Sequence, residues 1–224
     1  MPRCMQPALP LLILVVAYLL GSIPFSFLVV RLLAGADIRE HGSRNVGATN
    51  VARTFGKLPG LVALLLDIAK GYAAVAVARW ATSLPQWPLP ASADASPIHS
   101  AAFWIALCGL VAVLAHMFPV WLRFHGGKGV ATGTGAFLAI DPIALAAGVI
   151  VFLIVLIATR FVSLASMISS ASIPIFLHFL RHQPFWTIVI SMILVTSIIL
   201  KHHSNIARLA QRQERRMGEK KDPS

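Results

Sequence analysis

Six long apolar segments constrain the fold of this chain more than any other feature of its sequence. They cover residues 9–31, 58–79, 101–122, 143–159, 163–181 and 184–200. A helix needs roughly 20 mostly apolar residues to cross a bilayer, and backbone groups inside lipid must be hydrogen-bonded within the segment itself. The chain is 57% hydrophobic with a mean hydropathy of +0.78, which rules out the surface of a water-soluble domain. We therefore expect an all-α, polytopic integral membrane protein.

The distribution of Lys and Arg predicts how these segments cross the membrane. A seventh, shorter segment at residues 129–140 is rich in Gly and Thr and ends at an Asp-Pro pair. If it also crosses and the N-terminus lies outside, all but Arg3, Lys70, Arg79 and Arg181 of the 19 basic residues lie on one face. Basic residues accumulate on the cytoplasmic side of membrane proteins, whereas six spans would divide them between the two faces. We expect seven transmembrane helices in a bacterial inner membrane, a periplasmic N-terminus and a cytoplasmic C-terminus.

On this topology, residues 1–224 form a single transmembrane domain in which residues 201–224 are a basic cytoplasmic tail. The connection at residues 81–100 contains no Lys or Arg, and we expect it to be an inert external loop. The first apolar segment is longer than the core of a signal peptide and lacks a following A-x-A cleavage site. We therefore expect it to remain in the protein as a helix.

Composition also limits the chemistry and the partners. The net charge of +11 at pH 7 is concentrated in loops and the tail, where it suits anionic lipid head groups or phosphorylated substrates. We expect no nucleic-acid partner, because no nucleic-acid-binding module is present. Cys4 and Cys108 indicate neither a disulfide framework nor a metal site. The chain has no H-E-x-x-H or G-x-S-x-G motif, and no His followed five residues later by Asp, the motif of common soluble-headed glycerolipid acyltransferases. We expect no metal and no other cofactor.

A polar segment, Gly42–Arg53, lies between the first two apolar segments. Small residues let backbone N–H groups approach an anion, and hydroxyl groups and an arginine add further donors. The residues of this segment that we expect to act on a substrate are Ser43, Asn45, Thr49, Asn50 and Arg53. A polar connecting loop in which a helix starts at Ser43 or Asn45 is the alternative.

A lysine surrounded by glycines follows the third apolar segment, in His125–Gly133. Such a turn before a helix exposes N–H groups and the positive end of the helix dipole, and Lys128 supplies a mobile positive charge. We expect Gly126, Gly127 and Gly129 to contact a substrate phosphate with this lysine. The spacing is not that of a Walker A loop. A flexible turn with a lysine that reaches the interface is the alternative.

Two further pairs of polar residues lie next to apolar segments. His202 and Asn205, three residues apart, share one face of a helix that leaves the membrane, where they can hydrogen-bond a phosphate or hydroxyl group. An interfacial polar cap is the alternative for this pair. Ser163 and Ser166 follow a tight turn, where N-capping by Ser163 is the alternative to a role in the site. All four polar segments fall on the predicted cytoplasmic face, so we expect them to converge on one site.

Asp67 and Lys70 lie inside the second apolar segment, three residues apart. An unpaired charge there costs at least roughly 2.5–3.5 kcal/mol, so we expect the two side chains to pair. The sequence leaves open whether this pair is catalytic or only orders the bundle, and His116 has the same status.

Six motifs in this order resemble the bacterial acyl-phosphate:glycerol-3-phosphate acyltransferase family, PlsY type, over about residues 9–217. They are Gly21-Ser22-Ile23-Pro24, Asp37-Ile38-Arg39 with Gly42–Arg53, Asp67-x-x-Lys70-Gly71, His116–Thr132, Thr159–Ser166 and His202–Glu214. The resemblance implies transfer of a fatty acyl group from acyl-phosphate to the sn-1 hydroxyl of glycerol-3-phosphate. The product would be lysophosphatidic acid, made for phospholipid synthesis in contact with membrane lipids, and an upstream enzyme would supply the acyl-phosphate.

By the same resemblance, Ser43 and Arg53 help to bind phosphate, Lys128 and its glycine loop bind the substrate phosphate, and His202 with Asn205 completes the site. It places Ser166, and less directly Ser163, in the site and gives Glu214 a structural role. The chain departs from the family at Arg44, where Gly is usual, and at Arg212-Gln213-Glu214, where Gly-Thr-Glu is usual. Arg44 would either crowd its loop or add a phosphate contact.

Two other functions use the same features. A small transporter for phosphate or an organophosphate would need access from both faces, which the one-sided distribution of basic residues disfavours. A non-catalytic, lipid-binding membrane subunit would tolerate single substitutions at Arg53 or Lys128.

Overall fold

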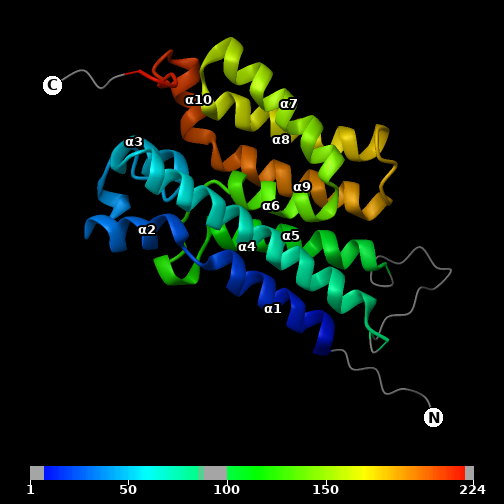
Figure 1. Ribbon diagram of the computed structural model, residues 1–224. Coiled ribbons are helices and arrows are strands. Elements are labelled where there is room, and N and C mark those ends of the chain that lie inside the picture. The colour runs from blue at the N-terminus through cyan, green and yellow to red at the C-terminus, as the bar shows by residue number, and fades with distance from the viewer. Residues whose placement is uncertain (1–7, 86, 88–99, 220–224) are drawn as a thin grey trace.

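The computed structural model describes residues 8–85, 87 and 100–219, and the described part is entirely helical (Figure 1). The α-helices are α1 (Ala8–Ser22), α2 (Phe25–Ala34), α3 (Ala48–Phe55), α4 (Lys57–Ser83), α5 (Ala101–Met117), α6 (Val130–Ile140), α7 (Pro142–Thr159), α8 (Val162–Phe179), α9 (Phe185–Lys201) and α10 (His203–Ala210). Short 3-10 helices occur at Ile38–Glu40 and Val120–Leu122. The all-helical prediction is confirmed, and most of the predicted external loop at 81–100 lies outside the described residues.

The predicted apolar segments correspond closely to these helices. Five helical stretches are long and apolar enough to cross a membrane: Ala8–Ala34, Lys57–Ser83, Ala101–Leu122, Pro142–Thr159 and Val162–Phe179. A sixth consists of α9 and α10 together, bent by 55° where they join. Helix α6, with 11 residues, is shorter than a full span, so the seventh crossing stays a prediction.

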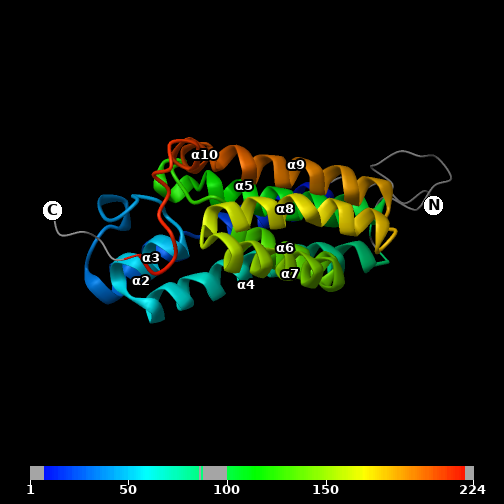
Figure 2. The ribbon, with the colours of Figure 1, turned by 90° about the horizontal axis from the view of Figure 1, so that it is seen from above.

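The helices form an elongated bundle whose two ends differ (Figures 1 and 2). Helices α2, α3 and α10 lie at one end, and the start of α1 lies at the other. The end with α3 and α10 also carries the loop that precedes α6. The polar segments predicted from sequence therefore gather at one end of the molecule.

Two of the predicted spans are interrupted near prolines. The segment 9–31 divides into α1 and α2 at Ile23 and Pro24, because proline lacks an N–H group and its ring restricts the residue before it. The α-helix in 101–122 ends at Met117, two residues before Pro119, and a 3-10 turn follows. Each interruption leaves backbone groups that other parts of the fold must satisfy.

Helix α6 is pressed closely against α4, which fixes the position of the loop before it. A methyl group added at Gly71 would overlap the carbonyl oxygen of Thr132, and one added at Gly135 would overlap that of Ile68. Small residues at such contacts let two helix backbones approach each other in a membrane protein. The start of α6 is thus held at a defined depth in the bundle.

Candidate active site

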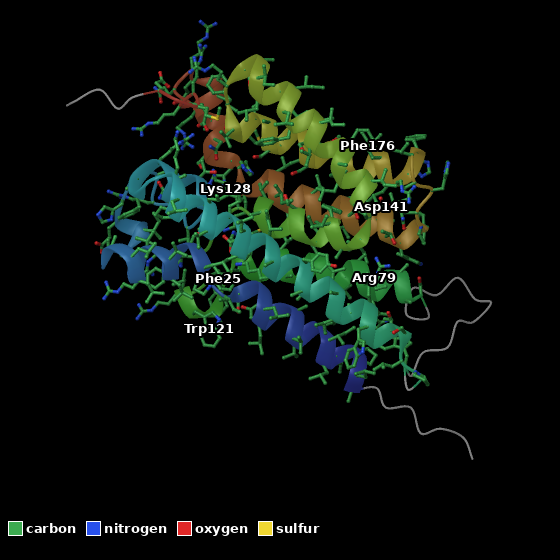
Figure 3. The ribbon with its side chains drawn as sticks, viewed as in Figure 1. Phe25, Arg79, Trp121, Lys128, Asp141 and Phe176 are labelled. Atoms are coloured by element: carbon green, nitrogen blue, oxygen red, sulfur yellow. The ribbon has the colours of Figure 1, made fainter. Side chains whose placement is uncertain are left out.

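A cavity of about 490 Å³ lies among α3, α4, α6, α7, α8 and the junction of α9 with α10. All four predicted polar segments contribute to its walls. Its polar lining includes Ser43, Asn45, Thr49, Asn50, Arg53, Lys128, Ser163, Ser166, His202, Asn205, Arg208 and Glu214. Figure 3 shows Lys128 in this part of the bundle, far from Arg79 and Asp141. The expected convergence of the four segments is confirmed, and the chemical roles of the residues stay predictions.

In the first polar loop, the side chain of Asn50 is used to shape the loop itself. Its Oδ1 accepts a hydrogen bond from the backbone N–H of Ser43 at 2.9 Å, and its Nδ2 donates to the carbonyls of His41 and Asn45. Both ends of the amide therefore shape the loop; Asn50 also lines the cavity, and its predicted substrate contact stays a prediction. The alternative of a helix start at Ser43 or Asn45 is wrong, since α3 begins at Ala48.

The glycine loop differs in part from its prediction. The N–H groups of Gly126 and Gly127 donate to the carbonyls of Met117 and His116, at 3.1 and 3.2 Å, and neither glycine lines the large cavity. Gly129 does line it, with a φ of 86° that suits glycine, directly before α6. The helix predicted to follow the loop is confirmed. The first two glycines hold the loop against α5, and their N–H groups do not face an anion in the cavity.

Lys128 lies at the centre of the polar wall. Its Nζ donates to the Oδ1 of Asn205 on α10. Burial lowers the pKa of Lys128 to about 8; Glu214 acts in the opposite direction, and Arg208 and Arg53 lower the pKa further. The lysine is therefore cationic at neutral pH, and an anion bound beside it would stabilise its buried charge.

Glu214 ties the C-terminal segment to the cavity wall. Its Oε1 accepts hydrogen bonds from Ser163 Oγ at 2.6 Å and Asn205 Nδ2 at 2.7 Å, and its Oε2 accepts one from Arg208 Nε at 2.7 Å. Burial raises the pKa of Glu214, but these three hydrogen bonds outweigh burial and hold the pKa below its usual value. The contacts fit the predicted structural role. N-capping by Ser163 is wrong, because Phe161 is the N-cap of α8.

Arg208 was not predicted as a site residue, yet it lines the cavity and forms an ion pair with Glu214. The sequence contained a signal for it: Arg208 follows Asn205 by three residues and therefore shares its helix face. Lys128 and Arg53 complete a cluster of three cations around one carboxylate. An anion is the ligand that such a cluster accommodates.

His202 is 3% exposed and lines the cavity at the end of α9. Its Nδ1 lies 2.8 Å from the carbonyl oxygen of Ile198, which only a protonated Nδ1 can contact favourably. In the neutral ring, Nε2 is then left as an acceptor. His202 can therefore accept a hydrogen bond from a substrate hydroxyl.

The rest of the cavity is mainly apolar and runs along α4, α6, α7 and α8. Its lining includes Leu64, Ile68, Phe137, Leu145, Val149, Phe152, Leu153 and Ile173. Leu64 on α4 and Val149 and Leu153 on α7 are 37%, 41% and 47% exposed, so the cavity is open along these two helices. Ser166, whose Oγ donates to the Val162 carbonyl, lies between the polar and apolar parts. The cavity thus joins an anion-binding end to a groove suited to a hydrocarbon chain.

The predicted pair of Asp67 and Lys70 is confirmed, with 2.7 Å between Oδ1 and Nζ. His116 joins it through Nδ1, 2.9 Å from Lys70 Nζ. Asp67 and His116 also line the cavity. Among the residues that the structure describes, no group of three or more His, Cys, Asp or Glu side chains is placed to hold a metal ion.

Comparisons with known proteins agree on one family. The family model described as "Glycerol-3-phosphate acyltransferase" matches residues 11–212. A glycerol-3-phosphate acyltransferase of Thermosynechococcus vestitus is 44% identical over 208 residues, covering 92% of this chain and 94% of the relative. One from Desulforamulus reducens is 40% identical over 212 residues, covering 94% of this chain and 96% of the relative.

Two crystal structures of PlsY (YgiH), an integral membrane glycerol 3-phosphate acyltransferase, have a similar fold. The glycerol 3-phosphate form has a TM-score of 0.80 and 36% identity, covering 93% of this chain and 96% of that one. The lysophosphatidic acid form has a TM-score of 0.78 and 34% identity, with coverages of 93% and 95%.

Proposed function

Because the chain belongs to the glycerol-3-phosphate acyltransferase family, we propose that its cavity transfers a fatty acyl group from an acyl-phosphate to the sn-1 hydroxyl of glycerol-3-phosphate. The protein is an integral membrane acyltransferase, and its product is lysophosphatidic acid. The observation that carries the proposal is the shape of the cavity, in which a cationic end continues into an apolar groove. Each substrate of this reaction carries a phosphate, and one also carries a long hydrocarbon chain.

At the cationic end, we assign phosphate binding to Arg53 and Lys128. Both line the cavity, and neither forms an ion pair with a carboxylate in the described part of the chain. Ser43, Asn45 and Thr49 supply further polar groups to the cavity wall. Charge-assisted hydrogen bonds to phosphate are among the stronger polar contacts, so this wall can hold two phosphorylated substrates close together.

The apolar groove is assigned to the acyl chain of the donor. At roughly 0.8 kcal/mol per buried CH₂, about 15 methylenes would retain an acyl-phosphate in the bilayer by about 12 kcal/mol. The exposure of Leu64, Val149 and Leu153 along the groove is consistent with sideways entry from lipid between α4 and α7. The donor then never has to leave the membrane to reach the site.

In the reaction, the sn-1 hydroxyl oxygen attacks the acyl carbonyl carbon and a new ester bond forms. The bond between that carbon and the phosphate oxygen breaks, and inorganic phosphate leaves with the bonding electron pair. Acyl-phosphate is already activated, so the attack does not require a strong protein base. A phosphate oxygen of the substrate takes the hydroxyl proton. Lys128 and Arg53 stabilise charge on the phosphates, and His202 Nε2 and Asn205 orient the attacking hydroxyl.

The finer location follows from the same charge distribution. The basic residues at the end of the bundle with α3 and α10 support a cytoplasmic active site in a bacterial inner membrane. Glycerol-3-phosphate would enter from the cytoplasm. An enzyme that forms acyl-phosphate would supply the donor.

The test supplies the purified protein, in detergent or in lipid, with palmitoyl-phosphate and labelled glycerol-3-phosphate, and with palmitoyl-CoA as a parallel donor. We expect labelled lysophosphatidic acid from palmitoyl-phosphate alone, and its loss in the Lys128→Ala variant. Product from palmitoyl-CoA at a similar rate would overturn the choice of donor. If no product formed but proteoliposomes accumulated glycerol-3-phosphate, the protein would be a transporter and the proposed reaction would be wrong.

A further inference from the structure

Three buried, ionisable side chains lie beneath the glycine loop, and the reaction described above does not use them. The side chains of Asp67, Lys70 and His116 are 1%, 2% and 7% exposed. They come from the middle of α4 and the end of α5. Burying two charges and an imidazole inside a membrane protein is costly, and such groups mark a functional requirement by default.

The ammonium of Lys70 has three close polar neighbours, two through hydrogen bonds and one through an ion pair. Its Nζ lies 2.7 Å from the carbonyl of Ile23, 2.7 Å from Asp67 Oδ1 and 2.9 Å from His116 Nδ1. The Ile23 carbonyl lies where α1 gives way to α2, and it also accepts a hydrogen bond from the backbone N–H of Phe25 at 3.1 Å. Asp67 Oδ2 accepts a further hydrogen bond from Ser26 on α2 at 3.2 Å. One lysine therefore joins α4, α5 and the break between α1 and α2.

This arrangement fixes the tautomer of His116. Its Nδ1 lies 2.9 Å from Lys70 Nζ, which can only donate, and 3.5 Å from Asp67 Oδ1, which can only accept; the shorter contact, to the lysine, makes Nδ1 the acceptor. The ring proton lies on Nε2, at the opposite side of the imidazole. A histidine held in this way presents one defined face to its surroundings.

The two loops that line the catalytic cavity meet over His116. A methyl group added at Gly127 would overlap His116 Nε2 and come within 2.7 Å of the Val46 carbonyl, which belongs to the first polar loop. The N–H of Gly127 also donates to the His116 carbonyl at 3.2 Å. Lys128 is the next residue, so the position of the His116 ring constrains the backbone that carries this lysine.

We propose that Asp67, Lys70 and His116 form a positioning group for acyl transfer, which sets the height of the glycine loop and so aligns Lys128 with the substrate phosphate. The proposal rests on the proposed function for its kinetic readout. Lys70 and Asp67 act through His116, and His116 acts through Gly127. A purely structural ion pair would stabilise the bundle but would leave the kinetic constants of the folded enzyme unchanged.

The test compares His116→Leu with His116→Asn, and His178→Leu serves as the matched control on the exposed face of α8. Asparagine offers an oxygen near the position of Nδ1, whereas leucine offers none. For His116→Leu we expect KM for glycerol-3-phosphate to rise about tenfold and kcat per folded enzyme to fall about tenfold, since small misplacements near a reacting group are costly. We expect His116→Asn to recover most of this loss and His178→Leu to match the wild type.

A second variant keeps the test decisive if His116→Leu fails to fold. Asp67→Asn combined with Lys70→Met removes both charges together and leaves no buried ion unpaired. We expect it to show the same loss of kcat/KM as His116→Leu. Wild-type kcat and KM in either folded variant would overturn the proposal and leave the three residues a structural role only.

Calorimetric binding of glycerol-3-phosphate, without any acyl donor, separates the two proposals. Weaker binding in His116→Leu, restored in His116→Asn, would support the positioning group even if the wild type made no lysophosphatidic acid. Unchanged binding in both variants, in protein that turns over normally, would contradict the positioning group and leave the proposed reaction intact.

Discussion

The two ends of the bundle contain similar charged residues but use them in opposite ways. At the end away from the cavity, Asp141 accepts hydrogen bonds from Arg181 and Gln183, each at 2.8 Å, and from two backbone N–H groups at the start of α7. Nearby, Arg79 donates to the Ala139 carbonyl at the end of α6 at 2.6 Å. At the cavity end, Lys128 has one neutral partner, Asn205, and faces open space.

This difference separates structural charges from functional ones in the fold. Where hydrogen-bond donors surround a carboxylate, the charges are balanced. Such a cluster holds helix ends in place and leaves no charge free to bind a ligand. Around Glu214, three cations share one carboxylate, so positive charge is left over for a substrate. If this contrast between the paired end and the cavity end governs function, losing a cation at the cavity end should lower activity and losing one at the paired end should lower stability.

The largest effect is expected from removing one cation at each end. Lys128→Ala should lower kcat/KM by about 10²–10³-fold, the usual result of losing one donor that stabilises developing charge. Arg181→Ala should leave kcat/KM within about twofold, since distant sites couple weakly, and should lower the free energy of unfolding by about 1 kcal/mol, because its partly exposed ion pair is lost. Initial rates and thermal unfolding of both variants measure the contrast.

A loss of kcat/KM in Arg181→Ala as large as that in Lys128→Ala would contradict this contrast. Such a result would mean that the far end controls the geometry of the cavity through α6 or α8. A large loss of stability in Lys128→Ala would also break it, since the lysine would then be a structural partner of Asn205.

A smaller effect is expected from pH. Lys128 is charged below its pKa of about 8 and neutral above it, so kcat/KM should fall as pH rises through 8 and approach a tenfold loss per pH unit. The sign for stability is opposite. The unfolded chain binds the proton more tightly, so the cost of burying the charge shrinks as pH rises from 8 toward the ordinary value of 10.5. Measured across pH 6–10, kcat/KM should fall above pH 8 while the free energy of unfolding rises.

Lys128→Arg is the control for this profile. A guanidinium stays charged across the whole range, so whatever activity remains should lose its decline above pH 8. An unchanged decline in Lys128→Arg would assign the titration to another group, such as a phosphate of the substrate.

The sequence predicted the helices well because each one is a local property. The apolar windows place the spans within a few residues, and the glycine-lysine pattern places the loop before α6. The one-sided distribution of basic residues also brought Arg53, Lys128 and His202 to one end without any knowledge of contacts. Periodicity and charge are sufficient for this level of description.

The remaining features depend on contacts between distant residues, which no local pattern contains. The hydrogen bond from Lys70 to the carbonyl of Ile23 joins positions 47 residues apart. The donation of Gly127 to the His116 carbonyl decides that this glycine supports the loop. The side chain of Asn50 likewise donates to two carbonyls of its own loop. The roles of these side chains are set by contacts that form only in the complete fold.

The smallest effect concerns backbone strain, and it compares the two ends again. Arg44 and Arg212, the two departures from the family pattern, both have a φ of 58°, and His182 at the paired end has a φ of 48°. These left-handed values cost a residue with a Cβ about 1–2 kcal/mol, and glycine avoids this cost while losing more entropy on folding. Each substitution to Gly should therefore raise the free energy of unfolding by roughly 0.5–1 kcal/mol.

Arg44 does not line the cavity, so Arg44→Gly should leave KM for glycerol-3-phosphate unchanged, as His182→Gly should. Thermal unfolding in one detergent and initial rates at varied glycerol-3-phosphate measure both quantities. A rise in KM for Arg44→Gly alone would show that this arginine adds a phosphate contact. In that case the excess of positive charge at the cavity end extends beyond the residues that line it, and the strain at Arg44 is the cost of placing that charge.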